Sequence, residues 1–393
     1  MEWLETDPAT AREVREQIAQ NLDARVNSGA LSRSDREAIL SRLRLATDYT
    51  SSAEAEFVVE AASEDFAAKR LVLREIERAV PPRTLVATSS SRFSVAKLGE
   101  GLKHVDRFLG MHFVNPDPEA TVVELAGTPA TAERILVEAR SICVKLGATP
   151  VKVKDSPGLI GSRVSRPLFL EALRLVETGE ADIGTVDQTM RQLGGMERGP
   201  FELMDRLGLD VELATTEALH ADLGRPAHLA PGAVQRKLVA AGHFGCRSGR
   251  GFYDYAHGQK TPAYEAPLKN VHSWKATAAL RELAASLGRP AEHMTWVFAR
   301  IFAAVVNEAA RAADTIALPR DVNLVMELGY GFAEGPLAVA DHVGLDIVQR
   351  LLREFHEDGG ADQRFAPNPL LDRHVSEGRL GEKTAKGFLH HSL

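Results

Sequence analysis

The chain of 393 residues is poor in cysteine, with only Cys143 and Cys246, and only 6% of its residues are aromatic. Two cysteines cannot build a disulfide framework, which excludes a small disulfide-rich secreted domain and suits a reducing compartment. No apolar run reaches about 18 residues, so no segment is predicted to cross a membrane. Residues 1–8 are neither basic nor apolar enough for a signal peptide. We therefore expect a cytoplasmic protein that makes no membrane contact.

A strong excess of charge of one sign is also missing. The net charge of −7 is modest, and basic residues alternate with acidic ones, as between Arg70 and Arg78. Nucleic acid is therefore not expected as a partner. A hydrophobic content of 44% and a charged content of 26% are typical of a globular protein. The length suffices for about two or three domains.

Residues 1–155 alternate between helical and strand-like patterns. Short apolar runs predict strands at 57–59, 84–87, 108–114, 121–125 and 150–153. Helical patterns lie between them, and the run at 57–59 predicts a strand buried on both faces. Val14, Ile18, Leu22 and Val26 recur at a regular helical spacing, as on one helix face. This alternation predicts an α/β domain with a mostly parallel sheet.

From Ser156 onward the pattern is helical and repeats itself. The segment 199–210 matches 335–346, and its Gly199-Pro200 start recurs as Gly335-Pro336. A match of this length and register predicts two all-α modules related by internal duplication. The expected divisions are an α/β domain at 1–155, a first helical module at 156–258, a connector at 259–290 and a second module at 291–393.

The chemistry is expected around His112, in the strand-like run 108–114. Glu124 lies in the next such run, at 121–125, and Ser91 lies just after the run 84–88. A hydroxyl, an imidazole and a carboxylate at the ends of neighbouring strands make a proton-transfer constellation. The simpler alternatives are a structural histidine whose hydrogen bonds are satisfied and a solvated carboxylate at a strand end.

Several ordered motifs together resemble the 3-hydroxyacyl-CoA dehydrogenases over essentially the whole chain. They are Val-Glu-Ala-Ala-Ser-Glu-Asp at 59–65, the serines at 89–91, Gly-Met-His-Phe-Val-Asn-Pro at 110–116, Ser-Pro-Gly-Leu-Ile at 156–160, Gly-Pro at 199–200 and Ser-Gly-Arg-Gly-Phe-Tyr at 248–253. The resemblance is strongest to bacterial members with two C-terminal helical modules, which act on 3-hydroxybutyryl-CoA or 3-hydroxyadipyl-CoA. It implies a Rossmann-like domain and oxidation of a 3-hydroxyacyl-CoA to a 3-ketoacyl-CoA, with hydride passing to NAD.

The resemblance also implies roles for individual residues. His112 would take the hydroxyl proton, because imidazole is the side chain that titrates near neutral pH. Glu124 would orient and stabilise the charged ring, and Ser91 would bind the substrate oxygen. Substrate contacts are expected from two serines that replace the usual residues: Ser162, in place of an asparagine, and Ser28, in place of a lysine that contacts CoA.

Cofactor contacts carry over in the same way. Glu5 would bind the adenosine ribose, and its carboxylate would repel a 2′-phosphate, which favours NAD over NADP. The alternative for Glu5 is an exposed glutamate, and for Lys69 a lysine on a helix surface. The other expected contacts are Glu64, Lys69, Ser91 and Asn115 near the nicotinamide or its ribose, and Arg247 in place of a lysine. No metal is expected.

The chain departs from this family at its start. A first strand and a glycine-rich turn that cradles the pyrophosphate would precede the segment around Glu5. Gly329-Tyr330-Gly331 is interpreted as a loop turn, because no strand precedes it. Two explanations are open. Either the start codon is misplaced and roughly 25 to 30 residues are missing, which we favour, or the protein lacks the cradle.

The second explanation leads to an alternative function. It is a relative with impaired cofactor binding that retains CoA-ester binding or an assembly role. A β-hydroxyacid dehydrogenase with a lysine base is disfavoured by the His112 motif. The chain forms a homodimer or pairs its two helical modules internally, and in the latter case residues near Ile301, Phe302 and Val305 should pack on the first module. The acyl-chain preference and the pathway are not fixed by the sequence.

Overall fold

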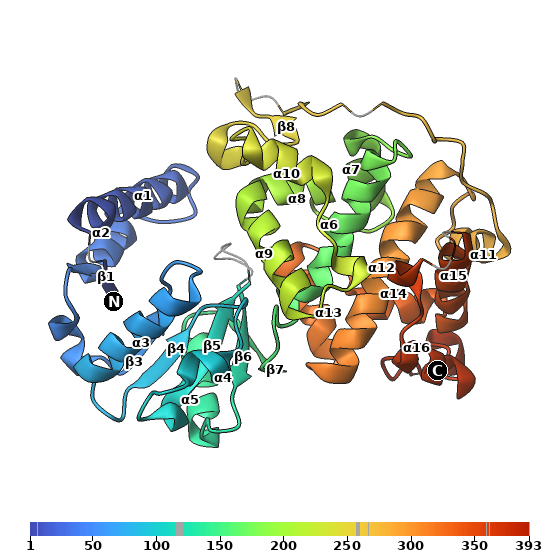
Figure 1. Cartoon of the computed structure of the whole chain (residues 1–393). Coiled ribbons are helices and arrows are strands. Elements are labelled where there is room, and N and C mark those ends of the chain that lie inside the picture. Colours follow the sequence, from blue (N-terminus) through green and yellow to red (C-terminus); the bar gives the residue numbers. More distant parts are fainter. Residues whose placement is uncertain are drawn as a thin grey trace.

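The computed structural model describes residues 1–5, 7–114, 121–256, 260–265, 267–358, 360 and 362–392. Its N-terminal part combines strands with helices, and its C-terminal part is almost wholly helical (Figure 1). No helix among the described residues is long and apolar enough to span a bilayer.

The main sheet of the N-terminal part has five strands in the order β3-β4-β5-β6-β7. Neighbouring strands run parallel except for β5 and β6, which are antiparallel. The predicted, mostly parallel sheet is confirmed. Cys143 of α5 is buried against one face of the sheet. The elements are β3 (Phe57–Glu60), α3 (Phe66–Ala79), β4 (Leu85–Thr88), α4 (Val95–Gly99), β5 (Phe108–Phe113), β6 (Val122–Gly127), α5 (Glu133–Lys145) and β7 (Thr149–Lys154).

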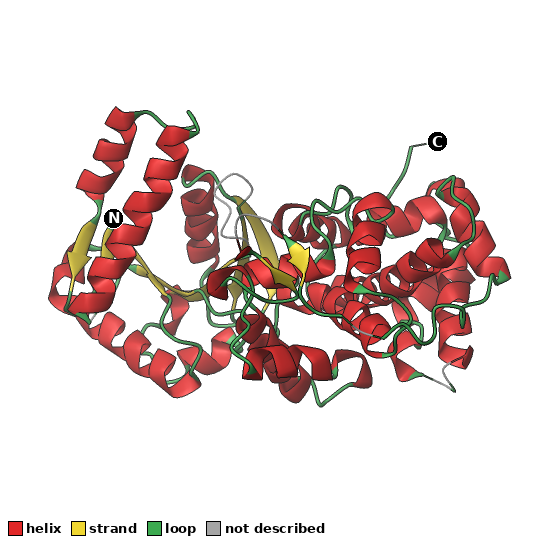
Figure 2. Cartoon of the chain, turned by 90° about the horizontal axis from the view of Figure 1, so that it is seen from above, coloured by secondary structure: helices red, strands yellow, loops and turns green. Residues whose placement is uncertain are grey.

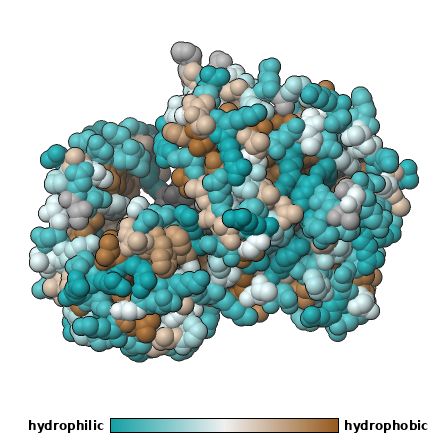
Figure 3. Space-filling model, viewed as in Figure 1, coloured by the Kyte–Doolittle hydropathy of each residue, from teal (hydrophilic) through white to brown (hydrophobic). Residues whose placement is uncertain are grey.

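The first residues form a separate layer. β1 (Glu2–Leu4) pairs in parallel with β2 (Arg44–Ala46), and α1 (Pro8–Asn27) and α2 (Arg33–Arg42) connect the two strands. The only fully buried residue of α1 is Ala11. Figure 2 shows this layer beside the main sheet, and Figure 3 shows a hollow between it and the rest of the chain, with apolar residues on its wall.

Within the described residues, β3 has a ladder partner on one side only, and β1 likewise. The prediction that 57–59 is buried on both faces is therefore wrong, since Phe57 is 37% exposed.

The helical part contains two successive groups of helices joined by a long connector. The turn predicted at Gly329-Tyr330-Gly331 is only partly correct, because Gly329 and Tyr330 belong to α13 and Gly331 caps it in the left-handed region. The elements are α6 (Gly161–Glu177), α7 (Ile183–Gln192), α8 (Pro200–Leu207), α9 (Leu209–Asp222), α10 (Ala233–Ala240), β8 (Tyr253–Asp254), β9 (Thr261–Pro262), α11 (Ala278–Ser286), α12 (His293–Thr315), α13 (Pro319–Tyr330), α14 (Pro336–Val343), α15 (Leu345–Asp358) and α16 (Pro369–Ser376).

The two groups use the same hydrogen bonds at equivalent positions of the sequence repeat. Asp205 accepts from the backbone N–H groups of Phe252 and Tyr253, both at 2.9 Å. The carboxylate of Asp341 accepts equivalent bonds from residues 388 and 389, at 2.9 and 2.8 Å. A Cβ on Gly251 or Gly387 would overlap the respective carboxylate oxygen, so both sites require glycine.

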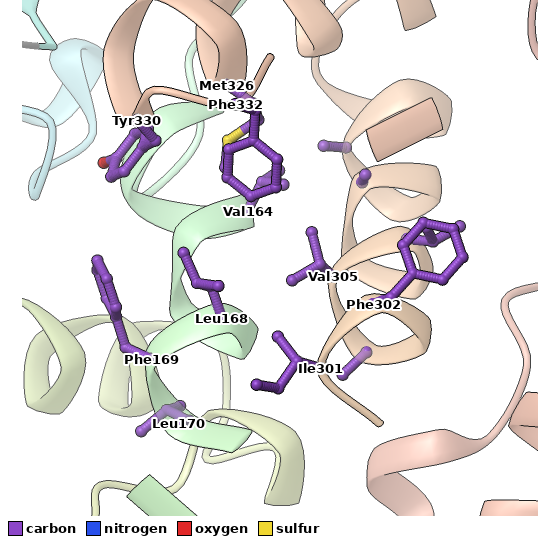
Figure 4. Close-up of a cluster of buried hydrophobic side chains, with 14 of the residues drawn as sticks. Val164, Leu168, Phe169, Leu170, Ile301, Phe302, Val305, Met326, Tyr330 and Phe332 are labelled. Atoms are coloured by element: carbon purple, nitrogen blue, oxygen red, sulfur yellow. The ribbon is translucent and has the colours of Figure 1, made fainter. Parts of the chain in front are cut away.

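The predicted packing of the second module on the first is confirmed for Ile301 and Val305. α12 runs beside α6, and both side chains point toward Leu168 across the contact (Figure 4). Phe302 points away from α6 in the same view, and it is buried against Phe298 of its own helix at a ring-centroid distance of 5.1 Å. Apolar side chains of both modules therefore form one continuous core.

Ion pairs also connect the two modules, and each module contributes both acidic and basic side chains to them. From the first module, Arg163 Nε lies 2.6 Å from Glu308 Oε1 and His228 Nε2 lies 3.2 Å from Glu308 Oε2. Arg311, one turn along α12, completes the set at 2.9 Å. Burial opposes the charge of Glu308, but His228 and the two arginines hold the pKa of this carboxyl at about 2.

The reverse arrangement surrounds Glu171 on α6. Its own helix supplies Arg174 at 2.6 Å, and the second module supplies Arg300 at 3.3 Å and Arg364 at 2.9 Å. Each module thus contributes a buried glutamate that forms ion pairs with arginine side chains of the other module. Such reciprocal contacts are typical of an interface with two-fold symmetry.

Truncating the side chain at the centre of this contact should destabilise the protein. We expect Ile301→Ala to lower the free energy of unfolding by about 2–5 kcal/mol, because it leaves a cavity between α6 and α12. Urea unfolding measures the change. Val137→Ala, on the exposed face of α5, is the control, and an equal loss from both variants would contradict the assigned contact.

Asp187 should make the stability depend on pH. It accepts bonds from Phe201 N, Glu202 N and the Tyr253 hydroxyl, and burial raises its pKa to about 7. The folded protein therefore holds this proton more tightly than the unfolded chain does, and stability falls as pH rises from about 4 to about 7.

Asn323 occupies the matching position in the second module and accepts from Leu337 N at 2.9 Å. We expect Asp187→Asn to reduce this pH-dependent loss. Urea unfolding midpoints at about pH 5 and about pH 8 test it, with the exposed Asp106→Asn as control. An identical pH dependence in wild type and Asp187→Asn would show the assignment to be wrong.

Candidate active site

His112 and Glu124 face each other across two antiparallel strands. They are direct register partners on β5 and β6, so their side chains leave the same face of the sheet. Nδ1 of His112 lies 2.7 Å from Oε2 of Glu124. Glu124 is fully buried and the His112 side chain is 16% exposed. The alternative of a solvated carboxylate at position 124 is therefore wrong.

The second oxygen of Glu124 is bound by the start of α6. Oε1 accepts from Ile160 N at 2.7 Å and from Gly161 N at 3.1 Å. The first N–H groups of a helix lack partners within the helix and carry partial positive charge, so they stabilise a carboxylate. Glu124 thus joins the imidazole, the sheet and the helical part through one side chain. Among the described residues, His112 Nε2 makes no hydrogen bond.

Ser91 lies beyond the end of β4, the strand that runs parallel to β5. Its hydroxyl lies 3.2 Å from the hydroxyl of Ser162 in the first turn of α6, and its carbonyl accepts from Gly158 N at 2.7 Å. The first turn of α6 therefore contacts both Ser91 and the His112–Glu124 pair. Ser162 is buried, and its short side chain contacts Ser91.

A second polar cluster follows β3. The ammonium of Lys69 is completely buried and donates to Glu60 Oε1 at 3.1 Å and to the carbonyl of Ala62 at 2.8 Å. Glu64 Oε1 lies 3.2 Å from the same Nζ, and the Ser90 hydroxyl donates to Glu64 Oε2 at 2.8 Å. The alternative that placed Lys69 on a helix surface is therefore wrong.

Glu60 is a buried member of this cluster that was not predicted from the sequence. This carboxylate is buried and also accepts from the hydroxyl of Thr88 on the neighbouring strand, at 2.6 Å. A charged residue that ends an apolar strand, with a lysine in the helix that follows, was the available signal, because a buried charge needs a partner.

The remaining predicted residues lie elsewhere. Glu5 follows β1 and accepts from Asp7 N at 3.2 Å. Ser28 caps the end of α1 and donates to the Arg25 carbonyl at 3.0 Å. Arg247 lies in a turn of the first helical module, where its guanidinium is 2.6 Å from Asp210. Asn115 lies outside the described residues.

Comparison with known proteins places this geometry in a family. Residues 1–156 match the family model described as 3-hydroxyacyl-CoA dehydrogenase, NAD binding domain, and residues 158–255 and 296–391 match the C-terminal domain of the same family. The chain is 28% identical to a 3-hydroxyadipyl-CoA dehydrogenase of Escherichia coli K12, over 90% of this chain and 88% of the relative. It is 31% identical to a probable 3-hydroxybutyryl-CoA dehydrogenase of Bacillus subtilis 168, over 64% of this chain and 87% of the relative.

A solved structure agrees with this similarity. The crystal structure of a 3-hydroxybutyryl-CoA dehydrogenase from Escherichia coli K12 superposes with a TM-score of 0.80 at 25% identity, and the match covers 96% of this chain and 93% of that chain. The family matches cover both the sheet domain and the two helical groups. The chain belongs to the 3-hydroxyacyl-CoA dehydrogenase family.

Proposed function

We propose that His112 is the base in the oxidation of a 3-hydroxyacyl-CoA to a 3-ketoacyl-CoA, and that Glu124 is its partner. The observation that carries the proposal is the 2.7 Å contact between His112 Nδ1 and the buried carboxylate of Glu124. This contact leaves Nε2 as the atom that would accept the proton of the 3-hydroxyl. The same contact would stabilise the imidazolium that forms.

NAD is the cofactor of this family, and when bound it accepts the hydride that leaves C3. The hydroxyl proton goes to His112 as the carbon–oxygen bond gains double-bond character. Ser91 would donate to the substrate oxygen, and the contact with Ser162 favours this role because it holds the Ser91 hydroxyl at the start of α6. Acidic Glu64 and buried Lys69 would line the nicotinamide end of the site.

The described residues fit only part of NAD. A pyrophosphate group is usually bound by free N–H groups at a helix start. In the described part of the chain, the helices that follow β1, β3 and β4 have these groups bonded to the chain's own carboxylates: Asp7 at α1, Asp65 at α3 and Asp155 at α4. These three helix starts therefore supply no free cradle of this kind, and no catalytic step is derived through one.

For the other contacts we retain the roles that the family suggests. Glu5 would bind the adenosine ribose, Asn115 would lie near the nicotinamide, and Ser28 would contact CoA. Arg247 is the weakest assignment, because the ion pair that it forms with Asp210 has a counterpart in the second module, between Lys383 and Asp346. A purely structural role explains both pairs.

We also propose the organisation of the chain. The divisions at 1–155, 156–258, 259–290 and 291–393 agree with the positions of the helices, and internal duplication accounts for the paired hydrogen bonds of Asp205 and Asp341. Internal pairing of the modules would replace a homodimer contact. We also propose a cytoplasmic location, because the low cysteine content suits a reducing compartment.

Removing the dyad should abolish most of the activity. We expect His112→Gln and Glu124→Gln each to lower kcat by about 100-fold or more, because the first lacks the base and the second lacks the charge that stabilises it. NADH absorbance with 3-hydroxybutyryl-CoA measures the rate. Glu133→Gln, on the exposed start of α5, is the matched control, and unchanged activity in the two dyad variants would rule out the assignment.

The alternative function is a relative with impaired cofactor binding that retains CoA-ester binding or an assembly role. It is favoured by the carboxylates that fill the starts of α1, α3 and α4 in the described structure. We expect titration of the full chain with NADH to give a saturable fluorescence change. Binding of acetoacetyl-CoA without any NADH response would favour the alternative.

A further inference from the structure

The second helical module reaches the catalytic pair through the end of α13. This helix ends at Tyr330, and Gly331 follows in the left-handed conformation with φ 72°. Two backbone hydrogen bonds attach the turn to the first module: Glu197 N donates to the carbonyl of Gly331 at 2.9 Å, and Ala333 N donates to the carbonyl of Gly195 at 3.0 Å. The position of Tyr330 is therefore fixed from both modules.

The ring of Tyr330 lies against the glycine that binds Glu124. A Cβ on Gly161 would lie 3.4 Å from Cε2 and 3.5 Å from the hydroxyl oxygen of Tyr330. The same Cβ would meet Val114 Cγ1 at 3.0 Å. Gly161 thus packs closely against both Tyr330 and Val114, which lies just beyond the end of the strand that carries His112.

The preceding residue of α13 packs just as closely on the sheet. A Cβ on Gly329 would come within 2.6 Å of Val114 Cγ1 and 3.6 Å of Val122 Cγ1. The last turn of α13 therefore packs on β6 and on the residue that follows β5. A larger residue at position 329 would have to displace the side chain of Val114.

Tyr330 is buried, and its hydroxyl points away from the apolar cluster of Val164, Met326 and Phe332 (Figure 4). Burial raises the pKa of Tyr330 well above its usual range, while the nearby Arg166 guanidinium and a hydrogen bond with Ser165 act in the opposite direction. The phenol thus stays neutral and contributes packing in the space beside α6.

We propose that Tyr330 is a positioning residue of the active site, supplied by the second module. Its ring holds Gly161 against β5 and β6, and Gly161 N in turn holds the Glu124 carboxylate in contact with His112. The second module then contributes the Tyr330 ring to the active site, in addition to stabilising the first module. This inference rests on the proposed function of the His112–Glu124 pair.

The test compares Tyr330→Ala, Tyr330→Leu and Tyr330→Phe in the full chain. Two readouts are used: kcat and KM for 3-hydroxybutyryl-CoA, and the imidazole nitrogen NMR signals of His112, assigned with His112→Gln. We expect Tyr330→Ala to lower kcat about tenfold, because small misplacements of catalytic groups are costly. KM should change less than kcat, the His112 signals should shift, and Tyr330→Phe should restore both readouts.

Phe365→Leu is the matched control, because Phe365 is also a buried ring of the second module and packs on Phe355. It should leave the His112 signals unchanged. Tyr330→Leu serves if the alanine variant fails to fold. A folded alanine or leucine variant with wild-type kcat and wild-type His112 signals would overturn the proposal, as would a phenylalanine variant as impaired as alanine. If the wild type shows no dehydrogenase activity, the proposed function fails, and the NMR readout still decides whether Tyr330 positions His112.

Discussion

The geometry of the proposed active site depends on one buried carboxylate, which has hydrogen-bond partners in both the sheet and the helical part. Glu124 accepts from the start of α6 with one oxygen and contacts His112 with the other. A buried charge is costly unless all its hydrogen bonds are made, so neither partner can be removed without penalty. This requirement ties the position of the helical part to the geometry of the imidazole. The junction between sheet and helices is therefore also the proposed catalytic site.

The two helical modules explain why this junction can be rigid. Glu171 and Glu308 each form ion pairs with arginines of the opposite module across the contact between α6 and α12. Apolar residues fill the space between the helices. The start of α6 therefore supplies the N–H groups that bind Glu124, and the rest of the helix forms the interface with the second module. Pairing within one chain holds the partner at a high effective concentration without requiring a second subunit.

Much of this was predictable from the sequence, and the exceptions have physical reasons. The strands at β3 to β7 follow from short apolar runs, and the recurrence of 199–210 at 335–346 predicts the paired modules. Spacing could not identify the partners of Glu60, because they come from other elements, although its place at the end of an apolar run was a signal. It also could not show that Phe57 lies on an edge strand, or that Tyr330 ends a helix beside Gly161, since both depend on tertiary neighbours.

A double-mutant cycle tests most directly whether His112 and Glu124 act as one unit. The measurement is kcat for wild type, His112→Gln, Glu124→Gln and the variant with both changes, under identical conditions. If the two residues act as a unit, removing either one already removes most of the rate enhancement that both provide. We therefore expect kcat of the double variant to be barely lower than that of the slower single variant. Losses that multiply, as for independent residues, would contradict it.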